Sequence, residues 1–148
     1  MTPQRLTSLA LPLLLTGCIG IADAVYPSGS AEPEPHSSHA EPSIMREIDV
    51  QQLKADRDQG SVPVLFDVRT PAEYAEGHVP GAINIPLDQV PSRLDAFEPH
   101  KGDEIYLICR SGGRSGQAGR FLEGQGYKTV NVMGGTAGWA TTGLPIER

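Results

Sequence analysis

One stretch of the sequence decides the fold: Ile105-Tyr106-Leu107-Ile108-Cys109-Arg110-Ser111-Gly112-Gly113-Arg114-Ser115. Its first four residues form a nearly continuous apolar run, which is typical of a strand covered on both faces in a parallel sheet. A short loop with two glycines follows, and the residues from Ser115 to Gln125 predict a helix that Gly126 ends. A buried strand, a tight loop and a helix in this order indicate one unit of an α/β sheet.

Further strands and helices are predicted on both sides of this stretch. Three more apolar runs predict strands, at Val62 to Val68, Ala82 to Ile85 and Val130 to Met133. One helix is expected to follow Asp49 as its N-cap and to run through Gln59, with Gln52 closing a capping box. A second helix is expected at Thr70-Pro71-Ala72-Glu73, with Thr70 as the cap and Glu73 reaching back to it. This alternation predicts one small α/β domain over residues 44–148.

Cys109 stands at the point of this pattern where chemistry is expected. The backbone N–H groups of the loop and of the helix N-terminus would surround one point and form a concave anion site. The helix dipole and the guanidinium groups of Arg110 and Arg114 would favour the thiolate of Cys109, which we expect to be exposed and nucleophilic. The alternative is that Cys109 is a small apolar residue at the end of a strand.

The loop Cys109-Arg110-Ser111-Gly112-Gly113-Arg114-Ser115 resembles the active-site loop of the rhodanese (sulfurtransferase) family. Other landmarks of that family agree in order along the chain: Asp67-Val68-Arg69, Glu73-Tyr74, the segment from Gly77 to Pro86, Gly134-Gly135 and Trp139. The resemblance implies a five-stranded, mostly parallel sheet with helices on both faces. It also implies that Cys109 lies at the C-terminal end of a central strand and carries a persulfide.

The resemblance implies a reaction as well as a fold. We expect sulfane sulfur to move from thiosulfate or a persulfide donor to cyanide or a thiol acceptor through Cys109. Arg110, Ser111, Gly112, Gly113, Arg114 and Ser115 would bind the donor and its sulfur, and no metal or organic cofactor is implied. The alternative is a non-catalytic module of the same family that senses sulfur or binds a partner.

A rival chemistry uses a similar loop. Cysteine phosphatases and related arsenate reductases carry a C-x5-R motif, whose loop holds a tetrahedral oxyanion, whereas Arg114 gives this chain the spacing C-x4-R. The shorter loop has less room, so a single sulfur on Cys109 fits it better than phosphate does. The P-loop pattern G-x-x-x-x-G-K-[ST] does not occur.

The remaining landmarks are expected to have structural roles. Asp67 and Arg69 are interpreted as an ion pair that braces the sheet. An attacking thiolate needs no general base, so His78 is interpreted as a turn residue whose ring is satisfied by local hydrogen bonds. Trp139 is expected to pack in the core under the Gly134-Gly135 turn.

Composition narrows the class of protein further. The chain has 148 residues, enough for one core, and its net charge of -6 gives no basic face for nucleic acid, so no nucleic-acid partner is expected. Its two cysteines, Cys18 and Cys109, lie in different surroundings and do not indicate a disulfide scaffold or a four-ligand zinc site.

The first residues predict an export signal. Leu6 to Leu15 is too short an apolar run to span a bilayer, so residues 1–17 are interpreted as a signal peptide. Leu15-Thr16-Gly17-Cys18 resembles a bacterial lipobox, which implies an acylated Cys18 and a lipoprotein on the periplasmic side of a membrane. The alternative is cleavage after Ala24, which would release a soluble periplasmic or secreted protein. Residues 18–43 are rich in Pro, Ser and Glu and predict a disordered tether.

Overall fold

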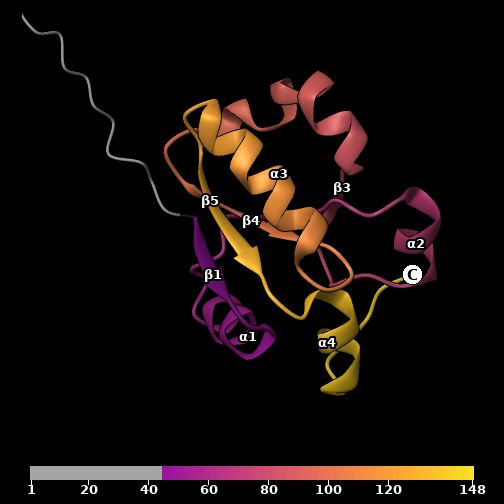
Figure 1. The fold of residues 1–148 in the computed structure, drawn as a ribbon. Coiled ribbons are helices and arrows are strands. Elements are labelled where there is room, and N and C mark those ends of the chain that lie inside the picture. Colours follow the sequence, from indigo (N-terminus) through magenta and orange to yellow (C-terminus); the bar gives the residue numbers. More distant parts are fainter. Residues whose placement is uncertain (1–44) are drawn as a thin grey trace, which may run out of the picture. The chain divides into compact units, whose positions relative to one another are not determined.

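The computed structural model describes residues 45–148, and the predicted signal peptide, lipobox and tether lie outside these residues. The described chain folds around one five-stranded sheet (Figure 1). The strands are β1 (Arg46–Ile48), β2 (Val64–Asp67), β3 (Ile83–Asn84), β4 (Glu104–Ile108) and β5 (Lys128–Val132). They lie in the order β1-β5-β4-β2-β3, and every neighbouring pair is parallel. The predicted α/β class is confirmed, and β4 is the central strand.

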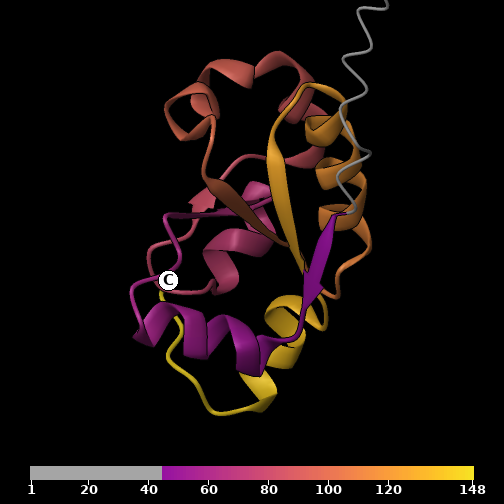
Figure 2. The same cartoon turned by 90° about the vertical axis from the view of Figure 1, so that its left-hand side faces the viewer.

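Side chains alternate along the strands and so build a core on each face of the sheet. One core joins Phe66, Leu107 and Cys109 to Ala118 and Leu122 of α3 (Gly113–Gly124). The other core joins Leu65, Tyr106 and Ile108 to Leu53 of α1 (Val50–Asp58) and Trp139 of α4 (Gly135–Thr141). Helices therefore cover both faces, as predicted (Figure 2). Within residues 45–148, no helix is both long enough and apolar enough to cross a membrane.

The predicted helix starts are present, with one correction. The Asp49 carboxylate accepts a hydrogen bond from the Gln52 N–H at 2.8 Å and caps α1. The Gln52 side chain does not reach back to Asp49, because its Nε2 donates to Asp56 Oδ1 at 2.6 Å, so the capping box predicted there is wrong. The second box is confirmed: Thr70 and Glu73 close it at the start of α2 (Pro71–Glu76).

Two features of the fold were not predicted from the residues. Strand β1 is only three residues long and pairs with β5 at the edge of the sheet, too short to give a hydrophobic pattern. Three short 3-10 turns connect β3 to β4, over Leu87–Ser92, Leu94–Ala96 and Glu98–His100. They contain Pro91 and Pro99, which are poorly compatible with a longer α-helix.

Candidate active site

Cys109 directly follows β4, at the edge of the sheet where parallel strands end. The chain then turns sharply at Gly112, whose φ of 114° favours glycine, and α3 begins at Gly113, two residues before the predicted start. A side chain at Gly112 would also bring its Cβ within 2.9 Å of Met133 Sδ. The tight strand-loop-helix turn expected from the sequence is therefore present.

The start of α4 holds this loop from the other side. The N–H groups of Gly134, Thr136 and Ala137 donate to the carbonyl oxygens of Ser111, Cys109 and Arg110 at 3.1, 2.8 and 3.0 Å. Gly135 lies so close to the loop that a Cβ there would be 2.2 Å from the Cys109 carbonyl oxygen. The segment that begins with Gly134-Gly135 thus binds the carbonyl groups of the Cys109 loop. The N–H groups of the loop remain free to face the sulfur.

The Cys109 sulfur accepts hydrogen bonds from the polar groups around it. The Gly112 N–H donates to Cys109 Sγ at 3.1 Å, and Ser115 Oγ lies 3.4 Å from the same atom. Burial alone raises the pKa of the Cys109 thiol, but hydrogen bonds from the Ser115 hydroxyl and from backbone N–H groups of Ser115, Ser111 and Gly112 outweigh burial and lower that pKa. The thiolate is therefore favoured mainly by hydrogen bonds. Arg114 adds to them, since the Cys109 charge also raises the pKa of Arg114.

Cys109 is more enclosed than expected. Only 1% of the residue is exposed, and it packs in the core with Val68 and Ala118. The sequence-based expectation of an exposed thiolate is therefore wrong, because the end of β4 lies under the loop and α3 and not at the surface. A reagent can reach Sγ only when neighbouring atoms move aside.

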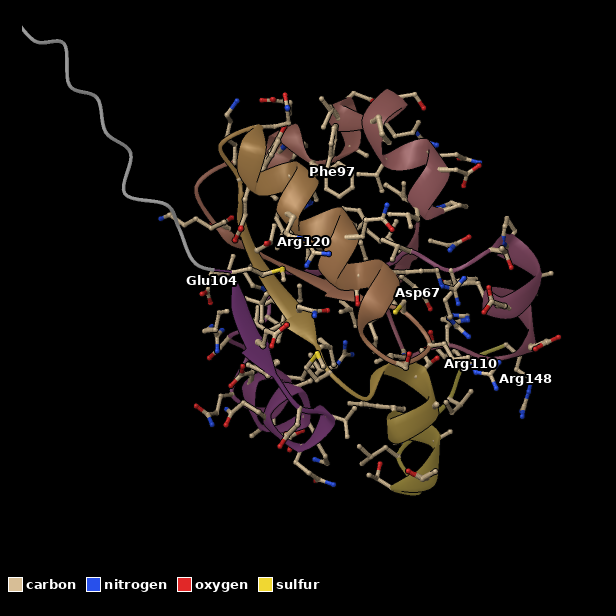
Figure 3. All side chains as sticks on the ribbon, in the orientation of Figure 1. Asp67, Phe97, Glu104, Arg110, Arg120 and Arg148 are labelled. Carbon is tan, nitrogen blue, oxygen red and sulfur yellow. The ribbon has the colours of Figure 1, made fainter. Side chains whose placement is uncertain are left out.

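The two loop arginines lie in different environments. Arg114 Nη1 and Nη2 donate to Glu73 Oε2 and Oε1 at 2.7 and 2.6 Å, a two-point ion pair that joins α3 to α2. The hydrogen bond from Arg114 is the main reason that the pKa of Glu73 falls to about 2. Arg110 is exposed and lines a hollow together with Arg69 and Arg148, and Figure 3 shows Arg110 and Arg148 on the same side of the domain. Arg110 is thus the loop guanidinium that remains available to an anion at this hollow.

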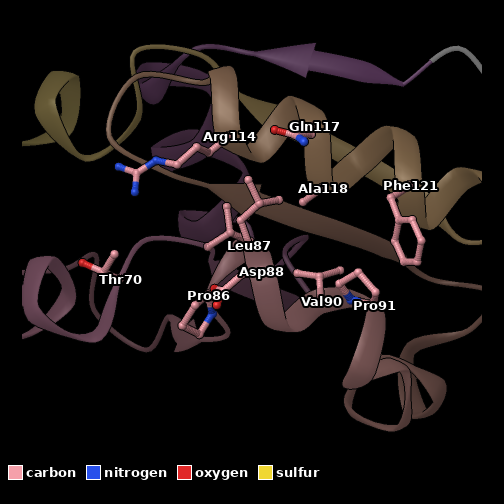
Figure 4. A pocket seen from close by; sticks show the side chains of 11 residues that line it. Thr70, Pro86, Leu87, Asp88, Val90, Pro91, Arg114, Gln117, Ala118 and Phe121 are labelled. Carbon is pink, nitrogen blue, oxygen red and sulfur yellow. The ribbon is translucent and has the colours of Figure 1, made fainter.

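A larger, mostly apolar cavity of about 530 Å³ lies on the other side of Arg114. It runs between α3 and the 3-10 turn that follows β3, with Arg114 and Thr70 at one end and Phe121 at the other (Figure 4). Its remaining lining residues are Val68, Pro86, Leu87, Asp88, Val90, Pro91, Gln117 and Ala118. The Glu73–Arg114 pair therefore connects this cavity with the arginine-lined hollow, since Glu73 lines the latter.

The landmarks interpreted as structural have structural surroundings. Arg69 Nη2 donates to Asp67 Oδ2 at 2.7 Å, and both residues are buried, which confirms the ion pair. The His78 ring stacks on Tyr74 with 3.7 Å between ring centroids, and its Nδ1 lies 3.0 Å from the Tyr74 carbonyl oxygen. Trp139 is buried and donates from Nε1 to the Pro145 carbonyl oxygen at 2.8 Å. Among residues 45–148, no cluster of three or more His, Cys, Asp and Glu residues is placed to hold a metal ion.

Two residues of the site were missed by the sequence-based prediction. Asn131 accepts from Ser115 Oγ at 2.7 Å, and Glu73 binds Arg114. Asn131 did leave a signal, because it is a polar residue within the otherwise apolar run from Val130 to Met133. Glu73 was assigned to the cap of α2 and counted among the family landmarks, but its contact with Arg114 was not predicted, because it joins residues 41 positions apart in the sequence.

Comparison with known proteins agrees with this geometry. A family model described as "Rhodanese-like domain" matches residues 49–142. A sulfurtransferase of Allochromatium vinosum is 39% identical over 104 residues, which cover 70% of this chain and 95% of that protein. The thiosulfate sulfurtransferase PspE of Escherichia coli is 45% identical over 70 residues, which cover 47% of this chain and 67% of that protein.

Solved structures show the same relationship. A rhodanese-like domain protein from Staphylococcus aureus superposes with a TM-score of 0.61 at 38% identity, over 70% of this chain and all of that one. The family match spans β2 to β5, the Cys109 loop and α4. This chain therefore belongs to the rhodanese-like domain family.

Proposed function

We propose that this chain is a sulfurtransferase that moves sulfane sulfur from thiosulfate or a persulfide donor to cyanide or a thiol, with Cys109 as the carrier. The observation that carries the proposal is the surroundings of Cys109 Sγ, which accepts from the Gly112 N–H and lies within reach of the Ser115 hydroxyl. These donors favour a thiolate, and the thiolate is the form of cysteine that attacks sulfur.

The first half of the reaction loads Cys109. Its thiolate attacks the outer sulfur of thiosulfate, a new S–S bond forms, and the old S–S bond breaks. Sulfite leaves with the electron pair of that bond, and the negative charge passes to the outer sulfur of a Cys109 persulfide. With a persulfide donor, the leaving group is a thiolate.

The second half returns the enzyme to its starting state. Cyanide attacks the outer sulfur and leaves as thiocyanate, and the electron pair of the broken S–S bond regenerates the Cys109 thiolate. The backbone N–H groups of residues 110–115 are the donors proposed to stabilise the outer sulfur anion. Arg110 is proposed to attract an anionic donor, since its exposed guanidinium lines the hollow beside the loop.

The experiment that tests this function follows sulfur on the protein. Thiosulfate alone is expected to add one sulfur atom per chain in intact mass spectra, and cyanide is expected to remove it as thiocyanate. Cys109→Ser is expected to lose both the mass gain and turnover, whereas Cys18→Ser, the matched control at the other cysteine, is expected to keep both. A sulfur-loaded Cys109→Ser protein would remove Cys109 as the carrier and with it this mechanism. A wild-type chain that neither loads nor turns over would favour the sensing or partner-binding alternative.

The location of the protein is part of the same proposal. Leu15-Thr16-Gly17-Cys18 supports a lipoprotein whose acylated Cys18 holds the domain on the periplasmic side of a bacterial membrane. Cleavage after Ala24 is the alternative, and it would discard Cys18.

A further inference from the structure

The Ser115 hydroxyl lies among three acceptors but has one hydrogen to give. Its Oγ is 2.7 Å from Asn131 Oδ1, 3.1 Å from the Gly112 carbonyl oxygen and 3.4 Å from Cys109 Sγ. Ser115 is fully buried. The hydroxyl hydrogen must therefore be shared among these atoms, and a change at one acceptor changes the hydrogen bond to the others.

Asn131 presents its oxygen, and not its nitrogen, to Ser115. Its Nδ2 lies 3.2 Å from Glu47 Oε1 and 3.3 Å from Met133 Sδ. An ionised carboxylate accepts only, so Glu47 fixes the amide with Nδ2 towards itself and Oδ1 towards Ser115. Glu47 and Asn131 are register partners of β1 and β5, which places both side chains on the same face of the sheet.

The preferred acceptor depends on where the sulfur charge lies. A Cys109 thiolate attracts a hydroxyl hydrogen more strongly than a neutral amide oxygen does. In a Cys109 persulfide the charge sits on the outer sulfur, so Sγ becomes a weak acceptor. The hydroxyl then needs another partner. Asn131 Oδ1 is the nearer of the two remaining acceptors, because the Gly112 carbonyl oxygen lies farther away, at 3.1 Å, and also accepts from the Gly116 N–H at 2.9 Å.

We infer that Asn131 is a positioning residue that gives the Ser115 hydroxyl a second hydrogen-bond acceptor. The hydroxyl points to Cys109 Sγ in the sulfur-free enzyme and to Asn131 Oδ1 in the sulfur-loaded enzyme. This inference rests on the proposed persulfide mechanism. Asn131 thereby stabilises the loaded state, since a buried hydroxyl without a good acceptor costs free energy. Glu47 contributes by keeping the amide in the accepting orientation.

Two substitutions at Asn131 should shift the pKa of Cys109 in opposite directions. Asn131→Leu removes the acceptor at nearly constant volume, so the hydroxyl stays with Sγ and the pKa of Cys109 falls. Asn131→Asp keeps an acceptor and makes it stronger, so the pKa of Cys109 rises. The new charge of Asn131→Asp raises the pKa of Cys109 by itself, so its effect is also measured in a Ser115→Ala background, where only the charge contribution remains.

The measurement is the pH dependence of Cys109 alkylation by iodoacetamide in the full-length, sulfur-free chain, with peptide mass spectrometry separating Cys109 from Cys18. Asn131→Leu is expected to raise the thiolate fraction about two- to tenfold at a pH below the pKa, the size of one neutral hydrogen bond. The same substitution in a Ser115→Ala background is expected to have no effect. The charged groups near the loop, Asp67, Arg69, Glu73, Arg110 and Arg114, are identical in all these variants.

A second variant keeps the test independent of packing inside the sheet. Glu47 is exposed, so Glu47→Ala is expected to fold normally. Without the carboxylate, the Asn131 side-chain amide is free to flip, which would exchange its oxygen and nitrogen. Loss of the Glu47 charge alone changes the pKa of Cys109, and Glu47→Ala in the Ser115→Ala background measures that change. When Ser115 is present, Glu47→Ala is expected to lower the pKa of Cys109 by more than this. Equal changes in the two backgrounds, for both Asn131→Leu and Glu47→Ala, would overturn the inference.

The loaded state is tested by equilibrium with mixtures of thiosulfate and sulfite. The ratio of loaded to free Cys109 is expected to fall about two- to tenfold in Asn131→Leu, because only the loaded state loses its hydroxyl acceptor. An unchanged ratio would overturn the role in the loaded state. A wild-type chain that never takes up sulfur would instead overturn the proposed function, whereas the alkylation comparison would still report on Ser115 and Asn131.

Discussion

Glu73 and Arg114 form a two-point ion pair that ties α2 to the first turn of α3, with donor-acceptor distances of 2.6 and 2.7 Å. The same carboxylate closes the capping box of α2, since the Thr70 N–H donates to Glu73 Oε2 at 3.2 Å. A planar guanidinium binds a carboxylate and an oxyanion through the same pair of N–H groups. Glu73 therefore occupies the two N–H groups through which the sequence led us to expect Arg114 to bind an anionic sulfur donor.

The role of Arg114 is tested by its removal. Arg114→Ala is expected to lower kcat/KM for thiosulfate about 10- to 1000-fold, as loss of one charged stabilising contact would. Arg114→Lys should recover only part of this, since an ammonium group lacks the planar fork. Steady-state thiocyanate formation gives kcat and KM for each variant.

Glu73→Gln is the matched control for Arg114. It removes the competing charge and leaves the guanidinium in place, so the KM for thiosulfate is expected to fall, while Arg114→Ala raises it. If Glu73→Gln reduced kcat/KM as much as Arg114→Ala does, Arg114 would serve by holding α2 and α3 together and not by attracting the donor.

The ion pair also makes stability depend on pH. The pKa of Glu73 is lowered to about 2, so its contribution to folding is complete above the pKa of the unfolded chain, about 4.3, and disappears as the pH falls through about 2. The Glu73 side chain is 30% exposed, so solvent screening reduces this contribution to about 1–2 kcal/mol.

Urea unfolding of wild type and Glu73→Gln at several pH values measures this contribution. The difference in unfolding free energy is expected to stay constant between pH 7 and about pH 5 and to shrink steadily from there to pH 2. Glu76→Gln, an exposed position on the same helix, should show no such trend. A difference between wild type and Glu73→Gln that persists unchanged at pH 2 would contradict the assignment.

The close contact between Gly135 and the Cys109 loop predicts that adding one methyl group at Gly135 strongly reduces stability and activity. In Gly135→Ala the new Cβ would be 2.2 Å from the Cys109 carbonyl oxygen and 2.5 Å from the Arg110 carbonyl carbon, at a φ of 56°. The backbone must shift to relieve this contact, so we expect a loss of about 1–3 kcal/mol in unfolding free energy and a large loss of activity. Thermal unfolding and sulfur transfer measure the two effects.

Gly138→Ala provides the control in the same helix. Its Cβ would meet Val50 Cγ1 at 3.4 Å, and its φ lies outside the positive region. Alanine is the better helix former, by up to about 1 kcal/mol. We therefore expect Gly138→Ala to fold at least as stably as wild type and to keep its activity. Equal losses in the two variants would mean that the Gly135 contact with the loop is not the cause.

The sequence predicted the parts of this molecule that local patterns encode. The apolar run before Cys109 predicted β4, and Thr70 with Glu73 predicted the cap of α2, because each signal lies within a few residues. The edge strand β1 was missed by residue patterns, since three residues give too little periodicity to recognise.

The site was harder to predict because its contacts join distant parts of the chain. Cys109 and its loop were found from the strand-loop-helix pattern, but the partners of the loop come from β5, α2 and α4. Nothing in the local sequence pairs Asn131 with Ser115 or Glu73 with Arg114. The burial of Cys109 was mispredicted for the same reason, since it depends on how closely α3 packs over the end of β4.

We expect membrane attachment to depend on a single residue of the predicted lipobox, Cys18. We expect the mature wild-type chain to partition with membranes through acyl chains on Cys18. Cys18→Ala is expected to remain unprocessed or to become soluble after cleavage at Ala24. Membrane fractionation with N-terminal sequencing measures both outcomes, and a soluble wild-type chain that begins at Val25 would contradict the prediction.

The burial of Cys109 predicts that reagent size limits its reactivity. A lowered pKa favours the thiolate at neutral pH, but only 1% of the residue is exposed, so a bulky reagent needs a larger movement of the loop than a small one. We expect iodoacetamide to modify the native protein much faster than an aromatic disulfide does, relative to their rates with a free thiol peptide. Hydrogen peroxide is also small and should therefore oxidise Cys109. The described chain has no second cysteine that could form a disulfide with the oxidised sulfur. In urea the preference for small reagents should disappear. Native rates that match those of the peptide for both reagents would show that the sulfur is openly accessible and that no movement of the loop is required.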